Sequence, residues 1–142
     1  MTTSTSSAVW EGGLRNGHGQ FKAGSGAFIG DYTFATRFES AKGTNPEELL
    51  AAAHAACVSM ALAAGLEAAK TPAKRISTKA SCTAEKVGDG FRITKMRLEV
   101  RGEVPGLDAA AFQAAAQKAR EGCPVSQALK GNVPMELDAR LA

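Results

Sequence analysis

The sequence has few of the features that mark secreted or nucleic-acid-binding proteins. It contains three cysteines in 142 residues, and an odd count does not fit the disulfide framework of a small secreted domain. Met1 to Ser7 are polar and lack the basic start and apolar core of a signal peptide. The net charge is only +3, and no basic run is interleaved with aromatic residues, so we expect no nucleic-acid partner.

Long hydrophobic runs are also scarce. The most apolar segment, Leu49 to Leu66, has about the length of a membrane span. Alanine dominates it, His54 and Ser59 interrupt it, and glutamates flank it. A buried core helix explains this pattern better, so we expect no membrane partner. We expect the protein to be cytoplasmic, where thiols stay reduced and a pairing cysteine is usually catalytic.

The motifs of several catalytic classes are missing. Neither the G-x-S-x-G elbow of serine hydrolases nor a G-x-x-x-x-G-K-[ST] phosphate loop occurs. The two histidines and three scattered cysteines offer no metal-ligand spacing such as C-x₂-C or H-x₃-H. We therefore expect neither a metal nor a cofactor.

The order of the expected elements predicts one α+β domain over residues 1–142, with strands, a helix, a hairpin, a helix and a strand in turn. Glycine-punctuated β-formers predict short strands within residues 8–38, the last running from Tyr32 to Phe38. Asn45 and Pro46 are typical of a helix start, and Glu47 and Glu48 suit its first turn. This Ala-rich helix is expected to end before Thr71-Pro72.

The second half is expected to begin with a β-hairpin that turns at Gly88-Asp89-Gly90. Apolar residues change parity along its second strand, which predicts a β-bulge near Thr94 or Lys95. A helix capped by Asp108, a short helix after Pro124 and a closing strand over residues 133–139 complete the prediction.

Three cysteines and their surroundings are the main candidates for chemistry. Cys57 lies in the middle of the Ala-rich helix, where a small buried hydrophobe is the more common role. Cys123 stands between Gly122 and Pro124 and is a candidate N-cap, a position that favours a thiolate; a linker cysteine is an equal alternative. Cys82 is expected to be core filler.

The charged and polar candidates are ambiguous by themselves. Arg37 lies on the less aromatic face of its expected strand and has the character of a surface residue. Glu47 is expected in the first helical turn for dipole reasons alone. His54, one turn before Cys57, is expected to be a packed helix residue rather than a base, and His18 to be a surface residue.

Taken together, these motifs resemble the osmotically inducible protein C family (OsmC/Ohr), which also contains the organic hydroperoxide resistance proteins. The resemblance covers nearly the whole chain, and the position of Arg37 just before the helix is similar to the osmotically inducible branch. The motifs that carry it are Thr36-Arg37-Phe38-Glu39, Gly43-Thr44-Asn45-Pro46-Glu47-Glu48-Leu49, Ala52-Ala53-His54-Ala55-Ala56-Cys57 and Gly122-Cys123-Pro124-Val125-Ser126.

The resemblance implies a thiol-dependent peroxidase that reduces organic hydroperoxides in oxidative or osmotic stress. It implies an OsmC-like α+β fold with sheets around the long helix, and an intertwined homodimer with sites at the subunit interface. Cys57 matches the peroxidatic cysteine, Cys123 the resolving cysteine, Arg37 the activating arginine and Glu47 its carboxylate partner. A dithiol reductant, often a lipoyl group in this family, is implied as well.

Two questions remain open at this level. Glu47 and Cys57 are ten positions apart, roughly 15 Å along one straight helix, so either the helix breaks, or Arg37 bridges the gap, or Glu47 serves the partner subunit's site. We favour the last of these. A redox sensor that uses the same cysteine pair without turnover is the alternative to an enzyme, and a module that binds small apolar ligands is a third hypothesis.

Overall fold

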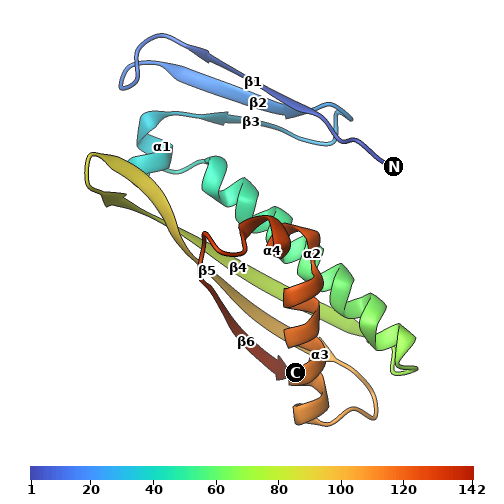
Figure 1. Ribbon diagram of the computed structural model, residues 1–142. Helices are drawn as coiled ribbons and strands as arrows, with labels where there is room; N and C mark the ends of the chain where they lie inside the picture. Colours follow the sequence, from blue (N-terminus) through green and yellow to red (C-terminus); the bar gives the residue numbers. More distant parts are fainter. The chain divides into compact units, whose positions relative to one another are not determined.

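The computed structural model describes residues 1–142 and divides them into two compact units, residues 1–49 and residues 50–142 (Figure 1). The first unit contains strands β1 (Ser6–Glu11), β2 (His18–Ala23) and β3 (Ile29–Tyr32) and the short helix α1 (Phe34–Phe38). The long helix α2 (Pro46–Ala68) begins in the first unit and continues into the second. The second unit also contains β4 (Arg75–Val87), β5 (Gly90–Glu103), α3 (Ala109–Gly122), α4 (Pro124–Leu129) and β6 (Met135–Leu141).

The first unit is an antiparallel sheet in the order β1-β2-β3, and a glycine allows its aromatic residues to pack together. Gly19 on β2 lies opposite both Trp10 and Tyr32. A Cβ atom at Gly19 would lie 2.5 Å from Tyr32 Cε1 and 2.7 Å from Trp10 Cε3. Because glycine leaves this space free, the two rings approach to 5.5 Å between centroids.

The strand expected over Tyr32 to Phe38 is wrong beyond Tyr32, because residues 34–38 form α1. Thr33 caps this helix: its Oγ1 accepts from the Thr36 amide at 3.2 Å, while the Thr33 amide donates to Thr36 Oγ1 at 2.9 Å. The rings of Phe34 and Phe38, four residues apart, lie 5.0 Å apart on one side of the helix. Reciprocal capping thus overrides the strand-like alternation of aromatic residues.

The expected start and end of α2 are confirmed. Asn45 Oδ1 accepts a hydrogen bond from the Glu48 amide at 2.8 Å, and Pro46 is the first helical residue. At the other end, the Thr71 amide donates to the Leu66 carbonyl at 2.9 Å, and Lys70 adopts a left-handed φ of 63°. These features form a Schellman-type C-cap, and Pro72 follows it.

The second unit contains a sheet in the order β4-β5-β6, and the predicted hairpin and bulge are confirmed. Thr83 pairs with Lys95 and Ala84 with Ile93, so Thr94 is the extra residue of the bulge. The closing strand β6 pairs parallel to β5. A parallel pairing needs a crossover connection, which α3 and α4 provide (Figure 1).

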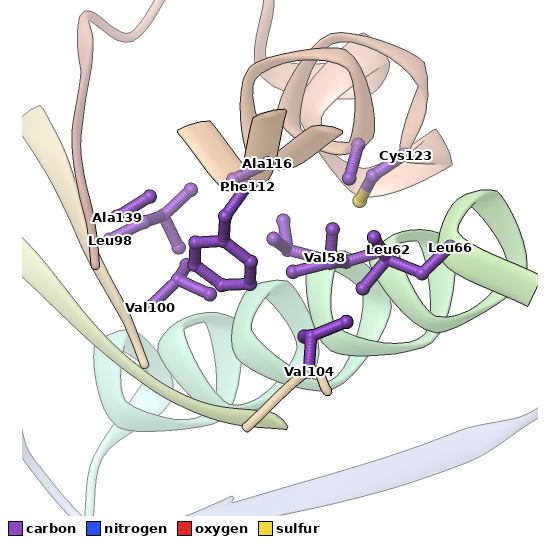
Figure 2. Packing of buried hydrophobic residues seen from close by; sticks show 11 residues of the cluster. Val58, Leu62, Leu66, Leu98, Val100, Val104, Phe112, Ala116, Cys123 and Ala139 are labelled. Carbon is purple, nitrogen blue, oxygen red and sulfur yellow. The ribbon is translucent and has the colours of Figure 1, made fainter. Parts of the chain in front are cut away.

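One hydrophobic core joins α2, α3 and the sheet of the second unit. Figure 2 shows the Phe112 ring of α3 directed between Val100 of β5 and Val58 of α2. Phe112, Val58 and Val100 are all fully buried. Phe112 fits because Gly102 opposes its ring: a Cβ there would lie 2.6 Å from Phe112 Cζ. The core therefore fixes α3, and with it the start of α4, above α2.

Helix α2 packs into the core, as expected, through one of its faces. Its buried residues are His54, Val58, Leu62 and Leu66, a stripe at helical spacing. By length and composition, α2 is also long and apolar enough to cross a membrane. Core helices of soluble proteins share these two properties. The apolar residues of the buried stripe of α2 belong to the hydrophobic core that also includes Leu98 and Phe112.

The contact between Gly102 and Phe112 gives a direct test of this core. We expect Gly102→Ala to lower the free energy of unfolding by about 1–3 kcal/mol, because the added methyl group meets a ring that cannot move freely. Gly90→Ala on the same strand, where a Cβ meets nothing within 4 Å, is the control and should change stability by less than about 0.5 kcal/mol. Urea denaturation measures both; equal effects would contradict the packing described here.

Candidate active site

The structure brings Cys57 and Cys123 together, although they lie far apart in the sequence. Cys57 is half-buried on α2, and Cys123 is fully buried at the junction of α3 and α4. A hydrogen bond joins the two thiol groups, and both cysteines are free rather than disulfide-bonded. The two thiols are therefore in contact without a disulfide between them. Figure 2 shows the Cys123 sulfur directed toward α2.

The first turn of α4 is directed at Cys57 instead of stabilising Cys123. Cys123 occupies the N-cap position of α4, but its side chain makes no capping hydrogen bond. The Val125 amide, in that first turn, donates a hydrogen bond to the Cys57 sulfur. Cys123 thus occupies the N-cap position that the sequence offered as one alternative, but its sulfur accepts no capping hydrogen bond. The Val125 amide donates to Cys57 instead.

Burial raises the pKa of the Cys57 thiol above its ordinary value. The hydrogen bond with Cys123 raises this pKa further, as does charge repulsion between the two sulfurs. The Val125 amide acts in the opposite direction, because it stabilises the thiolate, but it does not outweigh the other effects. Since only the thiolate is a good nucleophile, Cys57 needs a positive charge that these neighbours do not supply.

In the first unit, Arg37 and Glu47 form a fork-to-carboxylate pair. Arg37 Nε donates to both carboxylate oxygens of Glu47, at 3.1 and 3.3 Å, and Nη2 donates to Oε1 at 2.7 Å. The Glu47 side chain is 13% exposed and that of Arg37 38%. Such a pair fixes the plane of the guanidinium and leaves its other donors free to bind an oxygen anion.

Short local hydrogen bonds position this ion pair. Arg37 lies on α1, whose N-terminus is fixed by Thr33, and Glu47 lies in the first turn of α2. Asn45 connects the two elements: its Nδ2 donates to the Thr36 carbonyl at 3.2 Å while its Oδ1 caps α2. The segment expected to be a strand is therefore a helix that presents Arg37 to Glu47.

Arg37 also borders a pocket of about 240 Å³ in the first unit. Phe34 and Phe38 lie close to Arg37 in the sequence, but the sequence did not indicate Trp10, Leu14 or Tyr32 as neighbours of that arginine. The parity of Tyr32, Phe34 and Phe38 was the available signal; Trp10 and Leu14 come from a different hairpin. The lining residues are Trp10, Leu14, Tyr32, Thr33, Phe34, Arg37 and Phe38.

Two further candidates have defined positions outside the cysteine pair. Cys82 lies half-buried on β4, in register with Met96. His54 is fully buried, as expected of a packed helix residue, and its Nε2 lies 2.7 Å from Ser126 Oγ. The sequence did not indicate Ser126 as its partner, because that contact depends on α4 folding back to α2.

Helix α2 is continuous from Pro46 to Ala68, which removes one of the three explanations for the spacing of Glu47 and Cys57. Ten residues of unbroken helix separate the two side chains by roughly 15 Å along the axis. Glu47 therefore does not touch the sulfur of its own chain. Either Arg37 reaches across the gap, or the ion pair serves a second copy of the chain.

Comparison with known proteins defines the class of protein. Residues 39–138 match the family model described as OsmC-like protein. The chain is 50% identical over 131 residues to peroxiredoxin OsmC of Escherichia coli, covering 91% of each chain. It is 38% identical over 97 residues to an organic hydroperoxide resistance protein of Xanthomonas axonopodis, covering 67% of this chain and 66% of that protein.

Solved structures show the same fold. An organic hydroperoxide resistance protein from Elizabethkingia anophelis superimposes with a TM-score of 0.82 at 26% identity, covering 100% of this chain and 98% of the other. A protein from Legionella pneumophila described as organic hydroperoxide resistance protein OsmC gives 0.74 at 28% identity, with 99% of both chains covered. The fold is thus that of small α+β redox proteins. The chain belongs to the OsmC-like protein family, as the sequence motifs indicated.

The hydrogen bond between the two thiols has a measurable consequence. Cys123→Ala removes both effects of Cys123 that raise the pKa of Cys57, so we expect that pKa to fall. The pH dependence of Cys57 alkylation, followed by mass spectrometry in a Cys82→Ala background, measures the shift. A pKa that stays unchanged or rises would show that the two thiols do not interact.

Proposed function

We propose that this chain is a thiol-dependent peroxidase that reduces organic hydroperoxides to alcohols and serves in defence against oxidative stress. Cys57 is the attacking thiol and Cys123 the resolving thiol. The observation that carries the proposal is the hydrogen bond between these two free cysteines. The relatives named peroxiredoxin OsmC and organic hydroperoxide resistance protein support the reaction class.

The reaction balances with these two sulfurs and an external dithiol. The Cys57 thiolate attacks the terminal oxygen of the peroxide, the O–O bond breaks, and the alkoxide takes a proton to leave as alcohol. Cys57 becomes a sulfenic acid, which condenses with the Cys123 thiol to give a disulfide and water. A dithiol then reduces the disulfide by two thiol–disulfide exchanges and is itself oxidised. A lipoyl group is the dithiol that we expect.

Arg37 supplies the missing positive charge in this proposal. Its guanidinium stays protonated at all relevant pH values, and beside Cys57 it favours the thiolate against the effect of burial. The same donors stabilise the negative charge that develops on the leaving alkoxide oxygen. Glu47 holds the guanidinium plane through the three hydrogen bonds described above.

The surroundings of Arg37 favour an apolar peroxide. Trp10, Tyr32, Phe34 and Phe38 line the pocket that Arg37 borders. Burying an alkyl or aryl group against these rings is favourable in proportion to the apolar area removed from water, whereas hydrogen peroxide has no such group. The substrate class is therefore an organic hydroperoxide with a bulky apolar substituent.

A homodimer completes the proposal, with Glu47 and Arg37 of one subunit acting at the Cys57 site of the other. The side of α2 opposite its buried stripe is exposed and apolar, and Met60 in its middle is 78% exposed. A second copy of the chain would cover this surface, which otherwise remains in contact with water. The exposed residues of this side at helical spacing are Ala52, Ala56, Met60 and Ala63.

We place this reaction in the cytoplasm. Both thiols must return to the reduced state after each turnover, and glutathione and thioredoxin systems maintain such conditions there.

Replacement of Cys57 tests the chemistry. With excess dithiol, the wild-type protein should consume many equivalents of cumene hydroperoxide, and Cys57→Ser should reduce this to the uncatalysed rate because no thiolate remains. Intact mass after one equivalent of peroxide should fall by about two hydrogens, mapped to a Cys57–Cys123 disulfide. Cys82→Ser is the control and should behave like the wild type.

Other results would overturn this proposal. Peroxide consumption that survives in Cys57→Ser excludes Cys57 as the nucleophile. Consumption that stops near one equivalent per chain, despite excess dithiol, identifies a redox sensor instead of an enzyme.

Mixed dimers test whether Glu47 acts on the partner subunit. A dimer of one Cys57→Ser chain and one Glu47→Ala chain keeps one complete site if Glu47 acts across the interface, so about half of the wild-type activity is expected. The control pairs a wild-type chain with a chain that carries both changes; this dimer should be inactive. The reverse pattern, with an active control, would show that Glu47 serves its own chain.

A further inference from the structure

A buried hydrogen bond joins the two helices that carry the cysteines. His54 Nε2 lies 2.7 Å from Ser126 Oγ, and these residues are 0% and 2% exposed. His54 precedes Cys57 by three positions on α2, and Ser126 follows Cys123 by three positions at the start of α4. The His54–Ser126 bond therefore lies about one helical turn away from the Cys57–Cys123 contact, between the same two elements.

Packing alone does not account for a histidine at this position. Burial lowers the pKa of His54, so its imidazole stays neutral and carries one N–H. Its Nδ1 is buried and has no hydrogen-bonding partner among the protein's atoms. An apolar residue of similar volume would fill the space without leaving a polar atom unpaired, which is costly. The hydrogen bond with Ser126 is therefore the polar interaction that this buried imidazole makes.

The segment that Ser126 holds is small and carries two groups directed at Cys57. Helix α4 contains six residues, and its own contribution to helix stability is slight. The Cys123 thiol and the Val125 amide both contact the Cys57 sulfur from this segment. Any displacement of the start of α4 moves both groups at once.

We infer that His54 and Ser126 are positioning residues that hold the start of α4 against α2, so that Cys123 reacts with oxidised Cys57 before a second peroxide does. This inference rests on the proposed function and assigns a role to two residues outside the Cys57, Cys123, Arg37 and Glu47 set.

The resolving step has strict geometric demands. The Cys123 sulfur, as thiolate, attacks the Cys57 sulfur in line with its S–O bond; that bond breaks, and hydroxide leaves with the proton from Cys123 as water. Reacting atoms must be held near 3–3.5 Å, and a misplacement of about 1 Å can slow such a step up to about 100-fold. Overoxidation to sulfinic acid competes with this step, so slower resolution leaves more protein inactivated.

Four variants separate positioning from stability. Ser126→Ala and His54→Leu each remove the bond but leave a buried polar partner behind. The double variant His54→Leu/Ser126→Ala removes both partners and should have nearly wild-type stability, because no buried polar atom is left unpaired. His54→Gln is the conservative variant, since its side-chain amide can form a hydrogen bond with Ser126 Oγ.

Disulfide formation after one equivalent of cumene hydroperoxide, followed by rapid acid quenching and intact mass, measures resolution directly. We expect Ser126→Ala and the double variant to form the Cys57–Cys123 disulfide about tenfold more slowly. Sulfenic acid trapped by dimedone and sulfinic acid at high peroxide should rise in parallel. His54→Gln should restore most of the wild-type rate.

Ser59→Ala is the matched control. Ser59 lies on α2 two residues after Cys57, and its Oγ donates to Thr78 Oγ1 at 2.7 Å, so this variant loses a hydrogen bond of the same helix without affecting α4. It should resolve at the wild-type rate. Equal slowing in Ser59→Ala, or unchanged resolution in the double variant, would overturn the positioning role.

The same experiment keeps this inference separate from the proposed function. If the wild-type protein forms no Cys57–Cys123 disulfide, the proposed function itself fails. If the wild type forms the disulfide and the double variant forms it equally fast, the peroxidase remains and only the role of His54 and Ser126 is lost.

Discussion

The contact between the Cys57 sulfur and the first turn of α4 is the constraint on which the described chemistry depends. It brings the Cys123 thiol and the Val125 amide to the same atom. The contact exists because the core fixes α3 above α2: Phe112 occupies the space that Gly102 leaves open and packs toward Val58 (Figure 2). Since α3 ends at Gly122 and α4 begins at Pro124, there is no long linker to loosen Cys123. The two thiols are therefore in contact, and in the proposed reaction this contact limits the lifetime of a Cys57 sulfenic acid.

The same contact creates an electrostatic problem. Burial and a second sulfur raise the pKa of Cys57, and one backbone amide is not enough to offset them. Residues 50–142 thus bring two thiols into contact in surroundings that favour the neutral form of Cys57. In the proposed reaction, Arg37, whose guanidinium Glu47 orients within the first unit, supplies the positive charge that the thiolate needs.

Helix α2 carries residues of the ion pair, of the cysteine site and of the hydrophobic core. Its first turn carries Glu47, its middle carries Cys57 and His54, and its buried stripe forms the core of the second unit. Its continuity fixes roughly 15 Å between Glu47 and Cys57, so the arginine–glutamate pair and the thiol are separate along the helix. In the proposed homodimer, a second subunit would cover the exposed apolar side of α2 and bring its Arg37–Glu47 pair to Cys57.

Local signals in the sequence determined much of the fold. Asn45-Pro46 followed by glutamates set the start of α2, and the change of parity around Thr94 set the bulge, because capping and pleating depend on near neighbours. The motifs around Cys57 and Cys123 identified the family. The helix at residues 34–38 was missed, since the Thr33–Thr36 capping box competes with a strand-like pattern that is equally present. Only the tertiary structure decided the parallel pairing of β6, the use of the Val125 amide by Cys57, and the His54–Ser126 bond. Each of these joins residues far apart in the chain, and no local pattern records which distant partner a side chain meets once the core has formed.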